Sequence, residues 1–253
     1  MKVRTLRHVF VILAALLVLK VVAVTVLSYA DYLPPSFQVD FLRGREAYFY
    51  GSYRWAFYGH IFSGPLSLLL GLILISERFR LRFARWHRRL GKIQGMLVLL
   101  LVVPSGLWMA RYASAGPIAG LGFAALAVAT GVCVALGWQA AMQRRFAAHR
   151  VWMQRCFVLL CSAVVIRVIG GLATVMAAEA MWIDPAAAWL SWLGPLAAFE
   201  MSRRQGRWLV RLSAPATSED RTKEVYSIAP KQKTASRPTE FIHQGQPDRL
   251  LRW

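Results

Sequence analysis

Two short segments rich in histidine and arginine carry the side chains best suited to chemistry. They are residues 86–92 and 149–155, and each lies between two long apolar runs. Both contain a His-Arg pair, His87-Arg88 in the first and His149-Arg150 in the second. Neutral imidazole is the commonest metal ligand in proteins, and arginine binds carboxylates and phosphates. The pattern therefore predicts either a shared ligand site or a structural feature that occurs twice.

The ligand that fits such a pair best is a single b-type haem. A haem in a membrane helix bundle needs two axial ligands at one depth on facing helices. His87 and His149 would both lie on the cytoplasmic side, a few residues before a span, with Arg88 and Arg150 placed to bind propionates. In the alternative interpretation the histidines are structural, and each caps the following helix or holds a lipid phosphate together with its arginines. No other metal site is expected.

Three further polar residues lie inside apolar runs, namely His60, Arg167 and Glu200. Helix geometry places His60 and Arg167 at similar depths in the outer half of the membrane, so we expect them to be close. Small residues surround both, which predicts that these faces turn inward. Glu200 lies near the inner end of the last span, among Arg88, Arg150 and Arg155, where an ion pair with one of these arginines is expected. The alternative is a polar track that carries a small molecule or protons.

The elements that position these residues are membrane-spanning helices. Of the 253 residues, 57% are hydrophobic, against about 45–50% in a soluble domain. The excess lies in runs of about 20 residues, the length that crosses roughly 30 Å of hydrocarbon. We therefore predict an all-α helix bundle over residues 1–201 with six transmembrane helices. They cover about residues 9–28, 55–75, 93–110, 118–142, 153–177 and 186–201.

The net charge of +19 reflects membrane topology and does not indicate nucleic-acid binding. Basic residues gather at the ends of apolar runs, where the positive-inside rule predicts them. Segments 1–8, 76–92, 143–152 and 202 onward are basic, so both termini and these loops are predicted to be cytoplasmic. The expected location is the bacterial cytoplasmic (inner) membrane, with anionic lipid headgroups at the cytoplasmic loops. The first run is longer than the core of a signal peptide, which favours an uncleaved helix.

Two segments outside the spans differ sharply in composition. Residues 29–54 form an external segment rich in aromatic residues, which is typical of an aromatic belt at the membrane interface. Residues 202–253 are polar and basic and contain too little apolar surface to fold alone, so they are predicted to form a disordered cytoplasmic tail.

Enzymatic chemistry has little support in this sequence. None of the common nucleophile, metalloprotease, Walker or dinucleotide motifs is present. The three cysteines lie inside predicted spans, without the spacing of a metal site. We therefore assign no catalytic residue, and a role other than that of an enzyme is favoured.

An ordered set of short motifs resembles one known family. The motifs are Tyr58-Gly59-His60-Ile61 with Ser63-Gly64-Pro65, His87-Arg88 with Gly91-Lys92, His149-Arg150 with Trp152-Met153 and Arg155, Arg167, and Pro195 through Glu200 before an arginine pair. Together, over about residues 55–204, they resemble the bacterial predicted membrane proteins called domain of unknown function 2306. The resemblance implies a helical membrane fold and no established activity. Leu196 follows Pro195 where this family pattern leads us to expect Asn.

The sequence thus predicts a multi-pass integral membrane protein with no established molecular activity. Three functions remain open. The first is a redox or electron-transfer module that holds haem b between His87 and His149. The second is a small-molecule or proton carrier with a polar interior at His60, Arg167 and Glu200. The third is a lipid-binding protein whose His-Arg segments clamp headgroups.

Overall fold

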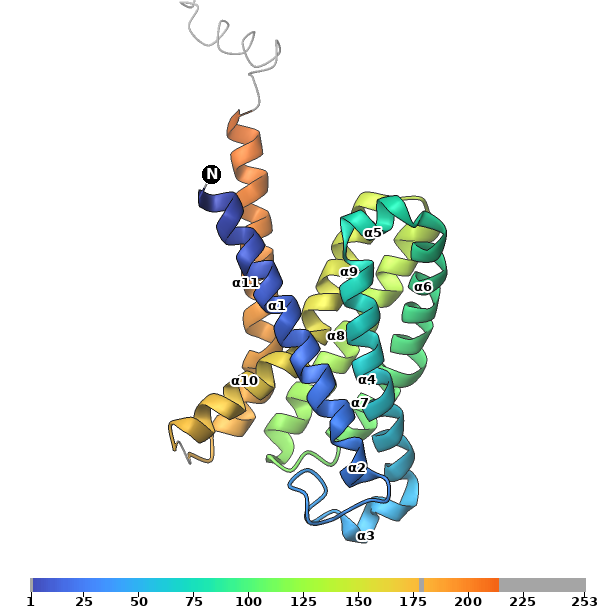
Figure 1. The fold of residues 1–253 in the computed structure, drawn as a ribbon, viewed down its shortest axis with the longest axis vertical. Helices are drawn as coiled ribbons and strands as arrows, with labels where there is room; N and C mark the ends of the chain where they lie inside the picture. The colour runs from blue at the N-terminus through green and yellow to red at the C-terminus, as the bar shows by residue number, and fades with distance from the viewer. Residues whose placement is uncertain (1, 178–179, 214–253) are drawn as a thin grey trace, which may run out of the picture. The chain divides into compact units, whose positions relative to one another are not determined.

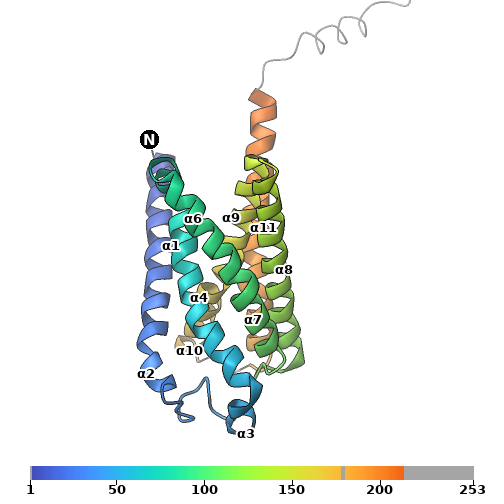
Figure 2. The ribbon, with the colours of Figure 1, turned by 90° about the vertical axis from the view of Figure 1, so that its right-hand side faces the viewer.

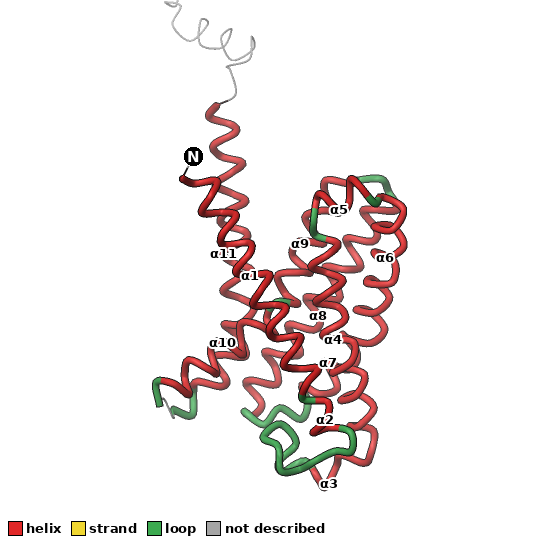
Figure 3. The backbone as a smooth tube through the Cα atoms, in the orientation of Figure 1, coloured by secondary structure: helices red, strands yellow, loops and turns green. Residues whose placement is uncertain are grey.

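The structure is a computed structural model that describes residues 2–177 and 180–213. Within these residues all regular elements are helices, and no strand is formed (Figure 3). In chain order they are α1 (Lys2–Leu27), α2 (Tyr29–Tyr32), α3 (Glu46–Tyr48), η1 (Phe49–Tyr53), α4 (Arg54–Leu74), α5 (Glu77–Arg82), α6 (Ala84–Leu97), η2 (Val98–Val102), α7 (Val103–Ala110), α8 (Gly116–Met142), α9 (Phe146–Leu160), α10 (Ser162–Val175) and α11 (Ile183–Ser213). The segments η1 and η2 are π-helical turns. The turn η2 joins α6 to α7 without a break, whereas η1 contains a kink at Gly51, whose φ of −77° and ψ of −148° are not helical.

Five helical stretches of the described chain are long and apolar enough to cross a membrane. They are Val11–Tyr32, Glu46–Leu74, Ala84–Ala110, Gly116–Met142 and Phe146–Val175. Each of the first five predicted spans overlaps one of these stretches. The sixth predicted span belongs to α11, which is not among the five; its sequence is interrupted by Asp184, two prolines and Glu200. The helix continues to Ser213, past the predicted boundary at residue 201, and the rest of the predicted tail lies outside the described residues.

The two His-Arg segments are helical, so their prediction as loops was wrong. Helix α6 begins at Ala84 and α9 begins at Phe146, which places His87 and His149 in the first turns of these helices. The reason is local: arginine has a high helix propensity, and no proline lies in either segment. The actual breaks are short and lie at Phe83 and at residues 143–145.

The helices pack through glycines that accept large side chains. A methyl group on Gly95 of α6 would lie 2.5 Å from the Trp138 ring of α8, and one on Gly71 of α4 would lie 2.7 Å from the Phe157 ring of α9. Such small residues let membrane helices approach closely. The main apolar core forms around these contacts and includes Val98, Val134 and Leu159. In Figure 2 the axes of the long helices α1, α4 and α8 are roughly aligned, and the chain in α1 runs opposite to that in α4.

The external segment, residues 29–54, folds as a cap on one end of the helices and contains α2 and α3 (Figure 1). Phe49, Tyr53 and Phe57 are almost fully buried in a second core, while Tyr50 and Trp55 are exposed. The predicted aromatic belt is therefore only partly present, since several of the rings pack against each other. Helix α5 lies at the opposite end of the helices.

The second half of the fifth span leaves the bundle. Helix α9 ends at Leu160, Cys161 forms a break, and α10 then points away from α9 (Figure 1). Gly171 and Thr174 are exposed as a result. The prediction that this small-residue face turns inward holds only in part. Ala163, Arg167 and Gly170 line a cavity between the helices, whereas Gly171 and Thr174 do not, because periodicity cannot detect a change of helix direction.

Candidate functional site

A partly open cavity of about 660 Å³ lies between the helices, beside the external segment. Its walls come from α1, α4, α7, α8, α10 and α11 and are largely apolar. The side chains with larger polar groups that line it are Tyr32, Arg45, Tyr53, His60, Tyr112, Arg167 and Asp184. Two of the three predicted interior residues, His60 and Arg167, therefore face one space.

His60 is held by a hydrogen bond across two helices. Its Nδ1 lies 3.1 Å from Oγ of Ser105 in α7. The Ser105 hydroxyl lies within hydrogen-bond reach of the carbonyls of Leu101 and Val102, which can only accept, so it donates its single hydrogen to them. The Ser105 oxygen must then accept from Nδ1–H of His60. This assigns the tautomer in which Nε2 of His60 is unprotonated and available as an acceptor.

The position of Ser105 follows from the local chain geometry. Pro104 lies in the first turn of α7 and has no N–H to donate to the preceding helix. The chain forms the π-helical turn η2 immediately before it. The Ser105 hydroxyl bonds carbonyls in that turn, as serine commonly does where proline interrupts a membrane helix. Proline thus leads to the turn that presents Ser105 to His60.

Arg167 lies on α10 and has no carboxylate partner in the part of the chain that the structure describes. Its Nη1 donates to the Ala163 carbonyl at 2.9 Å, and its Nη2 lies 3.4 Å from Oγ1 of Thr25 in α1. The side chain is exposed towards the open part of the cavity. The expected direct contact with His60 is not among the hydrogen bonds of the described residues, although both side chains line the same cavity.

A second arginine, which the sequence did not single out, also lines the cavity. Arg45 of the external segment is buried, with 7% of its surface exposed. Its Nε donates to the Phe41 carbonyl at 2.7 Å and its Nη1 to the Tyr112 carbonyl at 2.8 Å. The guanidinium also lies over the Phe41 ring. The only signal in the sequence was an arginine among aromatic residues, because Tyr112 is distant in the sequence.

His87 and His149 are placed differently from the predicted capping residues. Nδ1 of His149 donates to the Gly137 carbonyl of α8 at 2.9 Å, while the N-cap positions Phe83 and Arg145 have no side-chain cap. The capping prediction was therefore wrong for both histidines. Nδ1 of His87 is buried and has no hydrogen-bond partner among the described residues.

No hydrogen bond joins the two imidazoles within the described residues. Neither of them lines the 660 Å³ cavity. Haem binding by the pair therefore stays a prediction, without a described cavity to support it.

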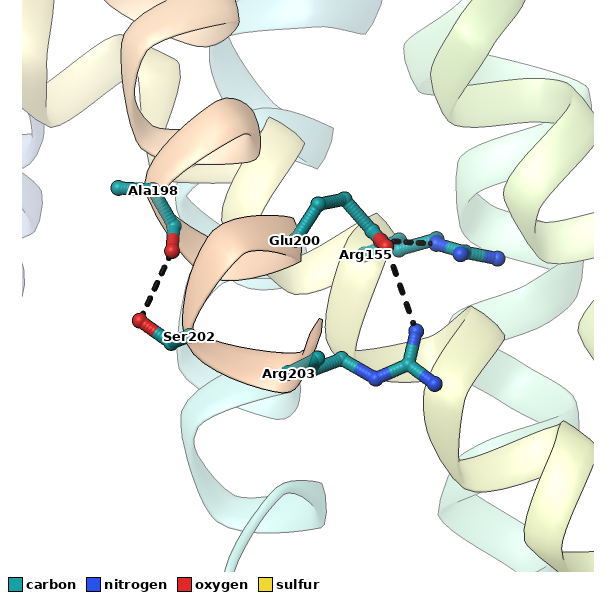
Figure 4. A network of polar contacts seen from close by, with 5 residues as sticks. All are labelled: Arg155, Ala198, Glu200, Ser202 and Arg203. Carbon is teal, nitrogen blue, oxygen red and sulfur yellow. Dashed lines mark hydrogen bonds and ion pairs between the residues drawn. The ribbon is translucent and has the colours of Figure 1, made fainter. Parts of the chain in front are cut away.

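Glu200 forms an ion pair with Arg155, one of the three arginines expected near it (Figure 4). Oε1 of Glu200 lies 2.6 Å from Nε of Arg155 in α9, and Oε2 lies 3.5 Å from Nη1 of Arg203. The Arg155 guanidinium also stacks over the Trp152 ring at 4.3 Å. Glu200 does not line the cavity of His60 and Arg167. The geometry of Glu200 therefore fits a structural ion pair that joins α9 to α11 better than a site on a polar pathway for a small molecule or protons.

Comparison with known families gives one result. A family model described as Predicted membrane protein (DUF2306) matches residues 57–201, a range that starts in α4 and includes His60, Arg167 and Glu200. Neither a curated protein nor a solved structure matches the chain.

Proposed function

Because the chain belongs to the DUF2306 family of predicted membrane proteins, and because a cavity with two arginines opens between its helices, we propose that it binds a small anionic amphiphile within the membrane. The cavity would serve as the binding site of a carrier or of a receptor. This function develops the second of the three expectations from the sequence.

The size and lining of the cavity support a small organic ligand. Ligand pockets in proteins commonly measure about 300–1,000 Å³ and combine apolar walls with a few placed polar groups. The cavity of about 660 Å³ lies within this range. Its apolar walls suit a hydrocarbon or aromatic portion of the ligand, and the arginines suit its charged end.

The charges support an anion. Arg45 and Arg167 line the cavity, whereas Asp184 is the one acidic side chain among the lining residues of the described chain. Arginine within a membrane span is costly unless it meets water or a partner, so an ionisable residue there indicates a functional site. A carboxylate, sulfonate or phosphate could accept hydrogen bonds from Arg167, and Nε2 of His60 could accept one from a ligand hydroxyl.

The observation that carries this proposal is the location of Arg167 on the cavity wall without a carboxylate partner in the described part of the chain. The test compares 4-phenylbutyrate with 4-phenylbutylamine, which differ in charge but share an apolar portion. We expect the carboxylate to raise the Tm of detergent-purified protein, because a ligand that binds only the folded state stabilises it. The amine should leave the Tm unchanged.

Arg167→Gln should weaken binding of 4-phenylbutyrate by about tenfold or more, as expected for loss of a charge-assisted hydrogen bond. Arg111→Gln is the matched control, since Arg111 is an exposed arginine of the α7–α8 turn that does not line the cavity. Equal binding of amine and carboxylate, or equal losses in the two variants, would refute the proposal.

We also propose that the protein resides in the bacterial cytoplasmic membrane, with α5 and the starts of α6 and α9 inside. The many arginines of residues 76–92 and 143–152 support this orientation. The acidic residues Asp31, Asp40 and Glu46 belong to the opposite, external segment. The basic segments would then contact anionic headgroups of the inner leaflet.

A further inference from the structure

We propose that the start of helix α6 is a specific binding site for the phosphate of an anionic phospholipid. The site is a surface hollow of about 340 Å³ lined by four basic residues and by nothing else. These residues, called the basic stripe below, are Arg85, Arg88, Arg89 and Lys92. This inference deepens the proposed contact with inner-leaflet lipids and does not depend on the ligand of the larger cavity.

Helix geometry brings the four side chains together. From Arg85 the other members follow at three, four and seven residues, which is the spacing of one helix face. They therefore extend over about two turns, roughly 10 Å along the axis. Several guanidinium groups and one ammonium group can in this way surround a single phosphate, which arginine binds in a bidentate manner.

Neighbouring acids do not neutralise the basic stripe. Glu77 is the one acidic residue of segment 76–92, and its carboxylate already binds Arg80 of α5 at 2.7 Å. No member of the stripe takes part in an ion pair within the described residues. The N-terminal end of the 14-residue helix α6 adds partial positive charge from its peptide dipoles. The four charges are thus available to an external anion.

The surroundings of the stripe indicate that this anion is carried by a lipid. The stripe lies at the start of the span Ala84–Ala110, which is the level of headgroups. Trp86 and Ile93, on the same part of the helix, have 55% and 47% of their surface exposed. Tryptophan at a span end is typical of the membrane interface. A phosphate bound here can therefore extend its acyl chains along exposed apolar side chains.

The repeated segment in α9 provides an internal comparison. When His87 is aligned with His149, Arg88 corresponds to Arg150. The other stripe members, Arg85, Arg89 and Lys92, correspond to Ala147, Val151 and Gln154. Of the four positions of the basic stripe, one, that of Arg88, is thus also basic in the aligned segment of α9. The headgroup site is for this reason assigned to α6 alone, in place of the symmetric pair of clamps considered from the sequence.

The test titrates detergent-purified full-length protein with single lipids and counts bound lipids by native mass spectrometry. Dioleoylphosphatidylglycerol and dioleoylphosphatidylcholine have the same acyl chains and differ in net charge. We expect one phosphatidylglycerol to bind at least tenfold more tightly than phosphatidylcholine. The variant Arg85→Gln/Arg88→Gln/Arg89→Gln should lose this preference.

The control variant Arg144→Gln/Arg145→Gln/Arg150→Gln removes the same charge near the start of α9 and should retain the preference within about twofold. Equal losses in both variants would show an effect of net charge alone and overturn the proposal. Equal binding of the two lipids by the unmodified protein would also overturn it. Displacement of phosphatidylglycerol by millimolar inorganic phosphate would assign the stripe to a soluble phosphate instead.

The Tm and the binding of 4-phenylbutyrate, measured on the same two variants, separate the two proposals. Unchanged values for both show that the fold and the large cavity are intact, so a loss of lipid preference then belongs to the stripe. If 4-phenylbutyrate does not bind even to the unmodified protein while the lipid preference is present, the cavity proposal fails and the lipid site stands.

Discussion

Backbone carbonyls accept the hydrogen bonds of Arg45 and Arg167, the two arginines that line the large cavity. Arg45 donates to the carbonyls of Phe41 and Tyr112, and Arg167 donates to that of Ala163. Arg155 instead binds the carboxylate of Glu200. Carbonyl oxygens satisfy hydrogen bonds without cancelling charge, so Arg45 and Arg167 keep their attraction for an anion, whereas Arg155 does not. This difference separates the candidate binding residues from the structural one.

The ion pair of Glu200 gives a test at the residue scale. Glu200→Gln should destabilise the protein by about 1 kcal/mol, because side chains that are about a quarter exposed are partly screened. The loss should appear as a lower Tm in detergent. Glu77→Gln is the control, since its pair with Arg80 is more exposed, with 71% of the Glu77 side chain accessible. A Glu77→Gln effect as large as that of Glu200→Gln would contradict a structural role for the α9–α11 pair.

At the scale of the helices, the close packing of α7 against α8 depends on the positions of the glycines in α8. Gly120, near the start of α8, lies so close to the end of α7 that an added methyl would be 2.6 Å from the Ala110 carbonyl oxygen. Gly131, on the same helix, would place its methyl in ordinary contact with Val103 at 3.5 Å. A methyl on Gly120 would clash with a backbone carbonyl, which cannot move without moving the helix. A methyl on Gly131 would contact a side chain at an ordinary van der Waals distance.

Substitution of these two glycines by alanine should therefore have opposite effects. Gly120→Ala should destabilise the protein by about 1–3 kcal/mol, the usual cost of overpacking. Gly131→Ala should be neutral or stabilise by up to about 1 kcal/mol, since alanine has the higher helix propensity. Thermal unfolding of the two purified variants measures the difference. Similar Tm values for both would show that α7 and α8 approach less closely than described.

At the scale of the whole molecule, the remaining question is whether α11 crosses the membrane. Asp184, at its start, lines the large cavity beside the external segment, and Glu200 reaches Arg155 in the first half of the stretch Phe146–Val175. Sixteen helical residues span roughly 24 Å, close to the thickness of the hydrocarbon core. Trp189 binds the Ile118 carbonyl of α8, and Ser191 is buried, so the helix packs against the bundle. These contacts support a sixth span.

Reporter fusions after residues 113, 144, 180 and 213 test this topology. Residues 113 and 180 should be periplasmic, and residues 144 and 213 cytoplasmic, if α11 completes six spans. A paired alkaline phosphatase and green fluorescent protein series would show alternating activities. A periplasmic reporter at residue 213 would mean that α11 does not cross, and a cytoplasmic reporter at residue 113 would reverse the proposed orientation.

Much of the fold could be predicted because the bilayer restricts the possibilities. Apolar runs of sufficient length indicated the first five spans. The helical starts at Ala84 and Phe146 were missed, since charged residues next to a span fit a loop and a helix equally well. The change of direction at Cys161 was also missed, because it produces no proline or glycine signal.

The candidate site could be predicted in part. Depth along each helix suggested that His60 and Arg167 share one region, and both line one cavity. Ser105 and Arg45 were not found, because their roles depend on contacts with residues far away in the sequence. Ser105 contacts His60, which is 45 positions away, and Arg45 contacts Tyr112, which is 67 positions away. Sequence spacing describes neighbours on one helix and carries little information on neighbours across helices.

By itself, the sequence determined that this chain is an all-helical membrane protein of its family, with its basic residues at the ends of the helices. Hydrophobic length and charge placement are local properties, and the membrane converts them directly into structure. Only the tertiary structure decided that Glu200 binds Arg155, that His149 binds Gly137, and that Arg167 faces a cavity. Those contacts depend on which helices pack together and in what register. The sequence of one helix does not specify how that helix packs against another that is distant in the chain.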